Sequence, residues 1–425
     1  MSTDTIKNVR TFRAFKSRNY RLYFIGQSVS LIGTWMQKTA VSWVIYSLTH
    51  STFMLGVTLF ASLFPSFLLS LVGGVVSDRY NRYRVLLTTQ AASLIQALLL
   101  AILILLKHYS VWEILSLSVV LGVINAFDVP ARQSLVYEMV DDKEDLPNAL
   151  ALNSSMVNLS RIIGPAIAGI VLESVGDGAC FLLNALSFVA VIISLLMMRL
   201  PQYVAKVHKK NVFGELKEGL AYIKRTPSIA FVIIMLGLIS LLVLPYNTLI
   251  PYFARDVFKG TARTFGVIDS FIGLGAFTGA IFLASQKTGA NLKMILCINT
   301  MVFGAGLILF SHEHVYALAL FFVMVAGFGM MSQVTITNTI IQTTAEPAMR
   351  GRVISLYAMA FFGMQPLGGL IVGSVSKWIG AADTLTGQGC AALILGLIHL
   401  RYLRKEKLKK EQDLILQEEH GLQAV

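Results

Sequence analysis

Long apolar segments with almost no charge alternate with short charged stretches along most of this chain. The clearest pair covers residues 53–76 and 85–106. As a helix, each is long enough to cross the hydrocarbon core of a bilayer, which takes about 20 residues. Because the chain is 55% hydrophobic and only 14% charged, whereas soluble proteins are about a quarter charged, the pattern predicts a membrane protein.

The repetition of this pattern predicts an all-α membrane protein with twelve transmembrane helices in two six-helix bundles. Residues 1–21 and 404–425 would be terminal segments, residues 22–198 and 228–403 the bundles, and residues 199–227 the linker. The expected spans are residues 22–48, 53–76, 85–106, 112–136, 149–172, 180–198, 229–253, 265–284, 294–310, 315–341, 353–378 and 385–403.

Cations cluster at the ends of the spans and set the expected orientation. Short cytoplasmic loops collect Lys and Arg, so the turn with Arg79, Arg82 and Arg84 should be cytoplasmic, together with the basic stretch 401–410. This places both termini of a multi-pass membrane protein in the cytoplasm. Topology also explains the net charge of +12, so we expect the lipid bilayer and no nucleic acid as a partner.

The longest polar interval, residues 201–227, contains the pattern of an amphipathic helix. Val212, Leu216, Leu220 and Ile223 recur at helical spacing among cations that include Lys206, His208, Lys209 and Lys210 upstream. Such a helix would lie on the inner membrane surface. A solvated linker is the alternative interpretation.

The residue patterns that several kinds of site require are absent from this sequence. Cys180, Cys297 and Cys390 stand singly in apolar segments, so we expect neither a disulfide framework nor a metal site. The chain contains no Gly-Lys dipeptide and hence no Walker A phosphate loop. Without a zinc-ligand His pair or a Ser/His dyad in the pattern, we expect no enzyme activity.

The charged turn after the second span carries a motif, Gly74-x-x-x-Asp78-Arg79-x-x-Arg82-x-Arg84. It resembles the loop motif between the second and third helices of major facilitator superfamily (MFS) transporters, although Asn81 replaces a Gly and Tyr83 a frequent cation. Asn tolerates a left-handed backbone, so we expect the turn to survive. Gly73 and Gly74 would allow a neighbouring helix to approach closely.

The two halves also look related. The stretch 145–150 leads to Gly164, Pro165 and Gly169, and the stretch 347–352 leads to Pro366, so each is a polar segment followed by a helix with a proline in its middle. MFS transporters are built as a parallel six-plus-six repeat with the substrate path between the halves. The resemblance therefore implies the MFS fold.

Ionisable side chains inside spans cost at least ~2.5 kcal/mol on insertion scales, so they need a partner, water or a function. Asp128 and Arg132 lie one helical turn apart and can pair with each other, either for function or as a self-neutralised structural pair. Arg161 precedes Gly164-Pro165, which resembles the fifth-helix motif of MFS antiporters; it could bind an anionic group or tether Asp128.

Further polar side chains are candidates for the translocation path. Gln37 with Lys38 on the first span and Asp269 on the eighth could face a cavity or the lipid interface, and Asp269 is the proton-binding candidate of the second half. The tenth span carries a polar run that includes Gln333 and Asn338. These amides could contact substrate or form interhelical hydrogen bonds.

The sequence suggests a latch on the cytoplasmic face. Glu138 at the end of the fourth span could pair with Arg79 or Arg82, and Asp78 could cap the eleventh span, which begins near Arg352. A carboxylate at a helix N-terminus stabilises by ~0.3 to 1 kcal/mol. In MFS transporters, equivalent contacts hold the outward-open state closed on the cytoplasmic side.

Stretches such as residues 15–22, 130–133 and 349–357 resemble the bacterial MFS branch of siderophore exporters of the enterobactin-exporter type and macrolide efflux pumps. The resemblance implies a protein of the bacterial inner membrane that exports a small molecule by rocking of two halves, coupled to protons and with no cofactor. We expect this protein to be a monomer. A lipid or lysolipid translocator of the same fold is the alternative. A non-transporting membrane sensor or scaffold is the alternative of another class, and the charges within the spans argue against it.

Overall fold

A computed structural model describes residues 10–107, 109–200, 212–287 and 289–423, and these residues form helices without strands. The N-terminal half contains η1 (Arg10–Lys16), α2 (Arg18–Thr49), α3 (Thr52–Arg79), α4 (Arg82–Leu105), α5 (Val111–Met139), η2 (Lys143–Asp145), α6 (Leu146–Ser174) and α7 (Asp177–Leu196). The C-terminal half follows α8 (Val212–Arg225) and contains α9 (Pro227–Leu242), η3 (Leu244–Leu249), α10 (Ile250–Tyr252), η4 (Phe253–Val257), α11 (Ala262–Ala284), α12 (Leu292–Ser311), α13 (Tyr316–Thr344), α14 (Arg350–Ile379) and α15 (Ala381–Gln423).

Eleven helical segments of the described chain are long and apolar enough to cross a membrane. The twelfth crossing is α2, which has 32 residues and packs along α6 and α7. Its hydropathy is lower because it carries polar side chains in its interior, among them Gln27 and Gln37, which are both 2% exposed. The predicted all-α membrane fold of two bundles is confirmed.

The helix contacts repeat from one half to the other. In the first half α3 packs on α5, α4 on α5 and α7, and α2 on α6. In the second half α11 packs on α13, α12 on α13 and α15, and α9 on α14, which is the same set of pairs in the same chain order. This correspondence is the pseudo-symmetry that the repeated proline-containing segments predicted.

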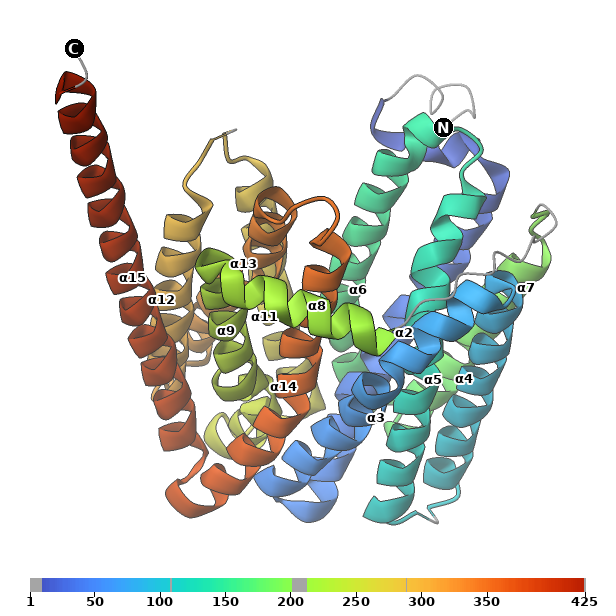
Figure 1. The fold of residues 1–425 in the computed structure, drawn as a ribbon. Helices are drawn as coiled ribbons and strands as arrows, with labels where there is room; N and C mark the ends of the chain where they lie inside the picture. The colour runs from blue at the N-terminus through green and yellow to red at the C-terminus, as the bar shows by residue number, and fades with distance from the viewer. Residues whose placement is uncertain (1–9, 108, 201–211, 288, 424–425) are drawn as a thin grey trace.

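Two long helix pairs join the halves, α6 with α11 and α3 with α14. We call the side where η1 and the end of α15 lie the terminal face, and the opposite side the distal face; the halves converge at the distal face and diverge toward the terminal face (Figure 1). Glycines allow the close approach: a Cβ built on Gly56 would lie 2.3 Å from the carbonyl oxygen of Gly369, and one on Gly266 would lie 2.3 Å from that of Pro165.

Hydrogen bonds between the halves lie in the middle and distal parts of the helices. Tyr46 donates to Asp256, Thr261 donates to Glu173 at 2.9 Å, and Ser376 donates to Thr52 at 2.7 Å. Near the terminal face, in contrast, α3 leaves Leu68 62% exposed and Val72 50% exposed. The molecule is therefore sealed at its distal face and open between the halves toward its terminal face.

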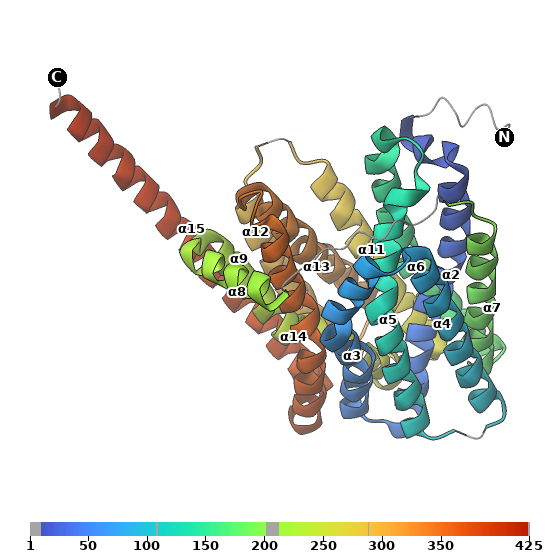
Figure 2. The same ribbon diagram turned by 45° about the vertical axis from the view of Figure 1, so that its right-hand side comes forward.

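Three elements differ from the predicted spans. The seventh span is a broken helix, because α9 ends at Leu242 and the chain continues through the 3-10 segment η3 at Pro245 and the π segment η4. The last helix does not end near residue 403; α15 continues through the basic tail to Gln423 and projects beyond the bundle (Figure 2). The amphipathic segment forms α8, which packs on α14 and α9, while Lys206, His208, Lys209 and Lys210 lie outside the described residues.

The charged turn persists, but two details differ from the expectation. Asn81 has φ −62° and ψ 109°, so it is extended rather than left-handed; it serves as the N-cap of α4 and accepts a hydrogen bond from the Arg84 amide at 3.2 Å. Gly73 is in close contact with α5, since its Cβ would lie 1.9 Å from the Ala126 carbonyl oxygen, but a Cβ on Gly74 would meet no described atom within 4 Å. The close approach thus depends on Gly73 alone.

Candidate translocation path

Two cations share one aromatic ring in the middle of the N-terminal half. The Nζ atom of Lys38 lies 4.8 Å from the ring centroid of Trp35, and the guanidinium carbon of Arg161 lies 5.7 Å from the same centroid. Helices α2 and α6 can bring them together because a Cβ on Gly164 would lie only 2.5 Å from Trp35 Cβ. Cation–π contacts of this kind contribute ~0.5 to 2 kcal/mol and hold both positive charges in place.

Asp269 of α11 completes this charged centre from the other half. Its Oδ2 accepts a hydrogen bond from Thr39 Oγ1 at 3.0 Å, and the charges of Lys38 and Arg161 both act on it. Arg161 does not tether Asp128; its other contact is Met330 Sδ on α13 at 3.6 Å. The centre therefore combines two cations and one carboxylate at the junction of the halves, away from the lipid interface.

A cavity of about 170 Å³ opens beside Lys38, between α2, α3, α4, α5 and η3. Hydroxyl and amide side chains line it, including Thr58, Ser118 and Asn125 from the N-terminal half and Asn247 and Thr248 from η3, although apolar atoms form the larger share of the wall. Lys38 is exposed although it lies in the interior of the bundle, because it faces this space. Both halves thus contribute to one polar compartment within the membrane region.

Gln37 forms a fixed part of that wall. Its Nε2 donates to Gln96 Oε1 at 3.1 Å, and its Oε1 accepts from Asn184 Nδ2 at 2.7 Å. Gln96 in turn donates to the Leu117 carbonyl oxygen at 3.1 Å. These bonds link α2, α4, α5 and α7, so Gln37 holds the compartment together and leaves Lys38 as the adjacent group that faces the cavity.

Asp128 and Arg132 form the predicted pair on α5, 3.2 Å apart. Asp128 is 5% exposed, and its Oδ1 also accepts from Thr89 Oγ1 at 2.9 Å and from Gln90 Nε2 at 2.7 Å. Both interpretations stay open, because a fully satisfied carboxylate stabilises helix packing and Arg132 also lines a hollow of about 500 Å³ near the terminal face.

The amides of the tenth span separate into two environments. Gln333 is 1% exposed and donates to Thr300 Oγ1 of α12 at 2.9 Å, which is an interhelical hydrogen bond. Asn338 is half-buried and accepts from Gln342 of the same helix at 3.1 Å. The structure therefore gives Gln333 an interhelical role and leaves Asn338 partly accessible.

The residues of the predicted latch lie at the terminal face. Arg82 pairs with Glu138 at 2.8 Å, one of the two pairings expected for that carboxylate. Arg352 pairs instead with Glu218 of α8 at 2.7 Å, so the linker helix engages the start of α14. Arg79 and Arg84 are exposed and Asp78 is half-buried.

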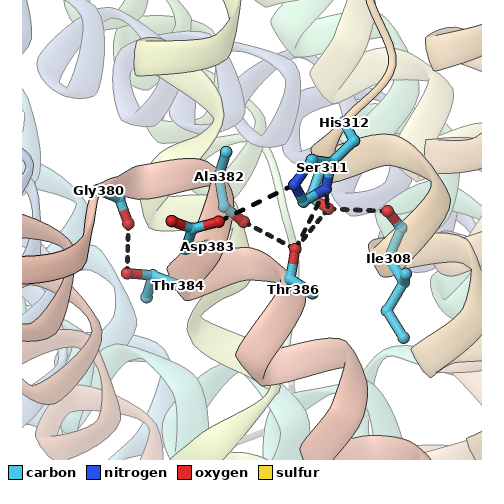
Figure 3. Close-up of polar contacts among 8 residues, drawn as sticks. All are labelled: Ile308, Ser311, His312, Gly380, Ala382, Asp383, Thr384 and Thr386. Carbon is cyan, nitrogen blue, oxygen red and sulfur yellow. Dashed lines mark hydrogen bonds and ion pairs between the residues drawn. The ribbon is translucent and has the colours of Figure 1, made fainter.

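One cluster at the distal face superficially has the composition of a catalytic triad (Figure 3). His312 Nδ1 lies 2.9 Å from Ser311 Oγ, and His312 Nε2 lies 3.9 Å from Asp383. Ser311, however, is 3% exposed and donates its single hydroxyl proton to the Ile308 carbonyl oxygen at 2.7 Å, so it is not a free nucleophile. With Thr386 2.8 Å from Ser311, the cluster joins α12 to α15.

Sequence reasoning missed Asn247 and Thr248, which line the cavity from the broken seventh span. The available signal was the pair Pro245 and Pro251 on either side of polar residues in an apolar segment. Interrupted helices supply binding groups in transporters, because unwound backbone and its neighbours can face a cavity. No role was expected for Trp35, because one of its two cation contacts, Arg161, comes from another helix.

The comparisons with known proteins agree with this architecture. The family model described as transmembrane secretion effector matches residues 9–421. The chain belongs to this family of the major facilitator superfamily. Members of the family and the relatives below are transporters rather than enzymes.

Relatives of this family member are similar over nearly their full length. The staphyloferrin A transporter of Staphylococcus aureus is 26% identical over 92% of this chain and 98% of the relative. The macrolide efflux protein A of Streptococcus pyogenes is 23% identical over 93% and 100%. The enterobactin exporter EntS of Escherichia coli O9:H4 is 25% identical over 91% and 93%.

Solved structures share the fold of this MFS protein. A POT family transporter in complex with 5-aminolevulinic acid has a TM-score of 0.74 and 14% identity, with 92% of this chain and 96% of that chain covered. A mutant of the nucleoside transporter NupG has a TM-score of 0.73 and 13% identity, with 90% and 99% covered. At such identities the similarity shows the fold alone.

Proposed function

We infer that this protein exports a small molecule from a bacterial cytoplasm by alternating access, and that export is coupled to proton antiport. The observation that carries the proposal is the polar compartment beside Lys38, which both halves enclose between a sealed distal face and a divergent terminal face. Groups of this polarity at membrane depth are costly unless they serve a path. The names of the relatives, two siderophore transporters and a macrolide efflux protein, support export of a small organic molecule.

The proposal assigns the terminal face to the cytoplasm, where the short turns carry Arg79, Arg82 and Arg84. The state described here is then inward-facing, ready to accept substrate from inside. Rocking of the halves about the α6–α11 and α3–α14 contacts would close the terminal face and open the distal one. In that outward-facing state, Asp78, Arg352 and the Arg82–Glu138 pair would form the latch.

Asp269 is the proposed proton-binding group. Its hydrogen bond from Thr39 crosses between the halves, so its protonation state acts on a contact that alternating access must break. A proton removes the negative charge that Lys38 and Arg161 face, and this changes the balance of the charged centre. Coupling requires such a group, because an ion shifts an equilibrium only through differential binding to the two states.

The test is transport by the purified full chain in proteoliposomes. Radiolabelled enterobactin, staphyloferrin A and a macrolide are offered under an imposed pH gradient, and substrate and proton fluxes are measured together. We expect proton flux to accompany substrate flux, and the Asp269→Asn variant to abolish this coupling. Asp383→Asn, an exposed distal-face carboxylate outside the path, is the matched control. Phospholipid movement without flux of these molecules would instead support the lipid translocator.

A further inference from the structure

The cavity beside Lys38 has one full charge in its wall and an excess of uncharged hydrogen-bonding groups. None of the described residues that line it is a carboxylate. The contact of Lys38 that orients its ammonium group is the Trp35 ring, at 4.8 Å. Lys38 shares the Asp269 carboxylate with Arg161, so the charged centre keeps an excess of positive charge. This excess attracts an anion in the cavity, because the surroundings screen it less than water does.

Two side-chain oxygens from the opposite half lack partners in the same place. Asn247 Oδ1 and Thr248 Oγ1 are buried and make no hydrogen bond with the described residues, and both residues line the cavity. Thr248 is only 7% exposed. A buried hydroxyl without a partner is destabilising, and an acceptor group in the cavity would supply that partner. The Thr248 hydroxyl can donate to an anion. The free Asn247 Oδ1 only accepts, so this residue can bind an anion through its Nδ2 hydrogens alone.

The size of the cavity limits what part of a substrate enters it. Ligand pockets that hold a whole drug-sized molecule measure ~300 to 1,000 Å³. At about 170 Å³, this cavity accommodates an end group instead. The remainder of the molecule would lie toward the open space between the halves.

We propose that this cavity is the subsite for an anionic, oxygen-rich end group of the substrate, such as a carboxylate, with Lys38 as its counter-charge and Thr248 and Asn247 as hydrogen-bonding partners across the junction of the halves. This assignment rests on the proposed transport function and names its substrate class. It also links occupancy to conformation, since the anion bridges α2 and η3, which belong to different halves. Molecules whose only charge is positive are disfavoured at this subsite.

The charge preference can be measured without any transport. In a background with Cys180, Cys297 and Cys390 replaced, Ser42→Cys places a thiol in the cavity wall close to Lys38. This thiol is treated with an anionic reagent, sulfonatoethyl methanethiosulfonate, and with a cationic one, trimethylammonioethyl methanethiosulfonate. The ratio of the anionic to the cationic reaction rate is then divided by the same ratio measured for free 2-mercaptoethanol. We expect the ratio to favour the anion on the order of 10-fold, and Lys38→Gln to remove this preference.

Control variants distinguish the effect of the Lys38 charge from the effect of a disturbed fold. Lys38→Arg should keep the anion preference, and Lys287→Gln, at an exposed lysine of the α11–α12 turn, should leave it unchanged. Carboxyfluorescein, an anionic dye, should protect the thiol of the Ser42→Cys variant from a neutral maleimide more strongly than rhodamine 6G, a cationic dye with the same xanthene core. An added Thr248→Val substitution should weaken this protection several-fold.

A reagent ratio at or below that of the free thiol overturns the proposal, as does a ratio that Lys38→Gln does not change. Equal protection by the two dyes, including no protection by either, also overturns it. The outcome is distinct from that of the transport test. An anion preference in a protein without flux supports the subsite and contradicts the export function. Proton-coupled flux without an anion preference supports the export function and contradicts the subsite.

Discussion

The contact between Gly56 and Gly369 gives a direct test of the proposed alternating access, because that cycle requires the contact to break when the distal face opens. A Cβ added at Gly56 would lie 2.3 Å from the Gly369 carbonyl oxygen and 3.3 Å from the Gly373 Cα. The nearer atom belongs to the backbone of a long helix, so it cannot move aside as a flexible side chain would. The Gly56→Ala substitution must therefore push α3 and α14 apart.

The expected magnitude follows from the cost of overpacking, which is ~1 to 3 kcal/mol. This cost applies to the distal-closed state alone, so the ratio of distal-closed to distal-open molecules should fall by about 5- to 150-fold. A suitable reporter is Ser376→Cys, since Ser376 is 5% exposed at the closed interface. Its reaction with a membrane-impermeant maleimide, added from the distal side, should accelerate by the same factor.

Two glycines serve as controls. Gly74→Ala changes the same helix, but the new methyl group meets no described atom within 4 Å, so the labelling rate should stay unchanged. Gly122→Ala places its Cβ 2.7 Å from the Ser62 carbonyl oxygen, within one half, and should lower the melting temperature without accelerating labelling. Equal labelling rates for Gly56→Ala and the parent protein, or the same acceleration in all three variants, would refute the reasoning.

The remaining predictions concern charges near the terminal face. Asp128→Leu leaves Arg132, whose side chain is 20% exposed, without its partner. Because this charge is partly solvated, the loss of stability should stay below the ~3 to 5 kcal/mol of a fully buried pair, and Asp128→Asn should cost less. Thermal unfolding in detergent measures both, and equal losses would contradict the pairing. Arg82→Glu should impair transport and the double exchange Arg82→Glu/Glu138→Arg should restore it in part, with a stability effect of at most ~1 kcal/mol, because both side chains are nearly one-third exposed. Asp78→Asn should shift the population toward the inward-facing state and reduce flux; normal flux with unchanged labelling of Ser376→Cys would exclude the latch.

Local properties of the sequence predict much of the fold. Segments of about 20 residues that lack charge must form helices in lipid, because each backbone polar group needs an internal partner there. The spacing of Asp128 and Arg132, one helical turn, similarly determined their pairing before any tertiary contact was known. The twelve spans and this ion pair were therefore predictable.

The roles of other candidate residues depended on which helices meet. Gln333 bonds to Thr300 on a neighbouring helix, whereas Asn338, five positions later, is half-buried and bonds to Gln342 of its own helix; both look alike in the sequence. Asn81 acts as a helix cap rather than a left-handed residue because the cap satisfies the Arg84 amide. Local polarity cannot decide between such alternatives.

The sequence by itself determined a bilayer-spanning chain of two bundles whose few embedded charges require a protected environment. It could do so because the hydrophobic length of a segment and the positions of its charges are local properties that can be read along the chain. Only the tertiary structure decided that Lys38, Arg161 and Asp269 form one centre around Trp35 and that Asn247 and Thr248 meet Lys38 across a cavity. These residues lie far apart in the chain and come together through glycine-mediated helix packing. The physical reason is that side-chain proximity in a helical bundle depends on helix crossing and rotation, which small contacts at the helix interfaces set.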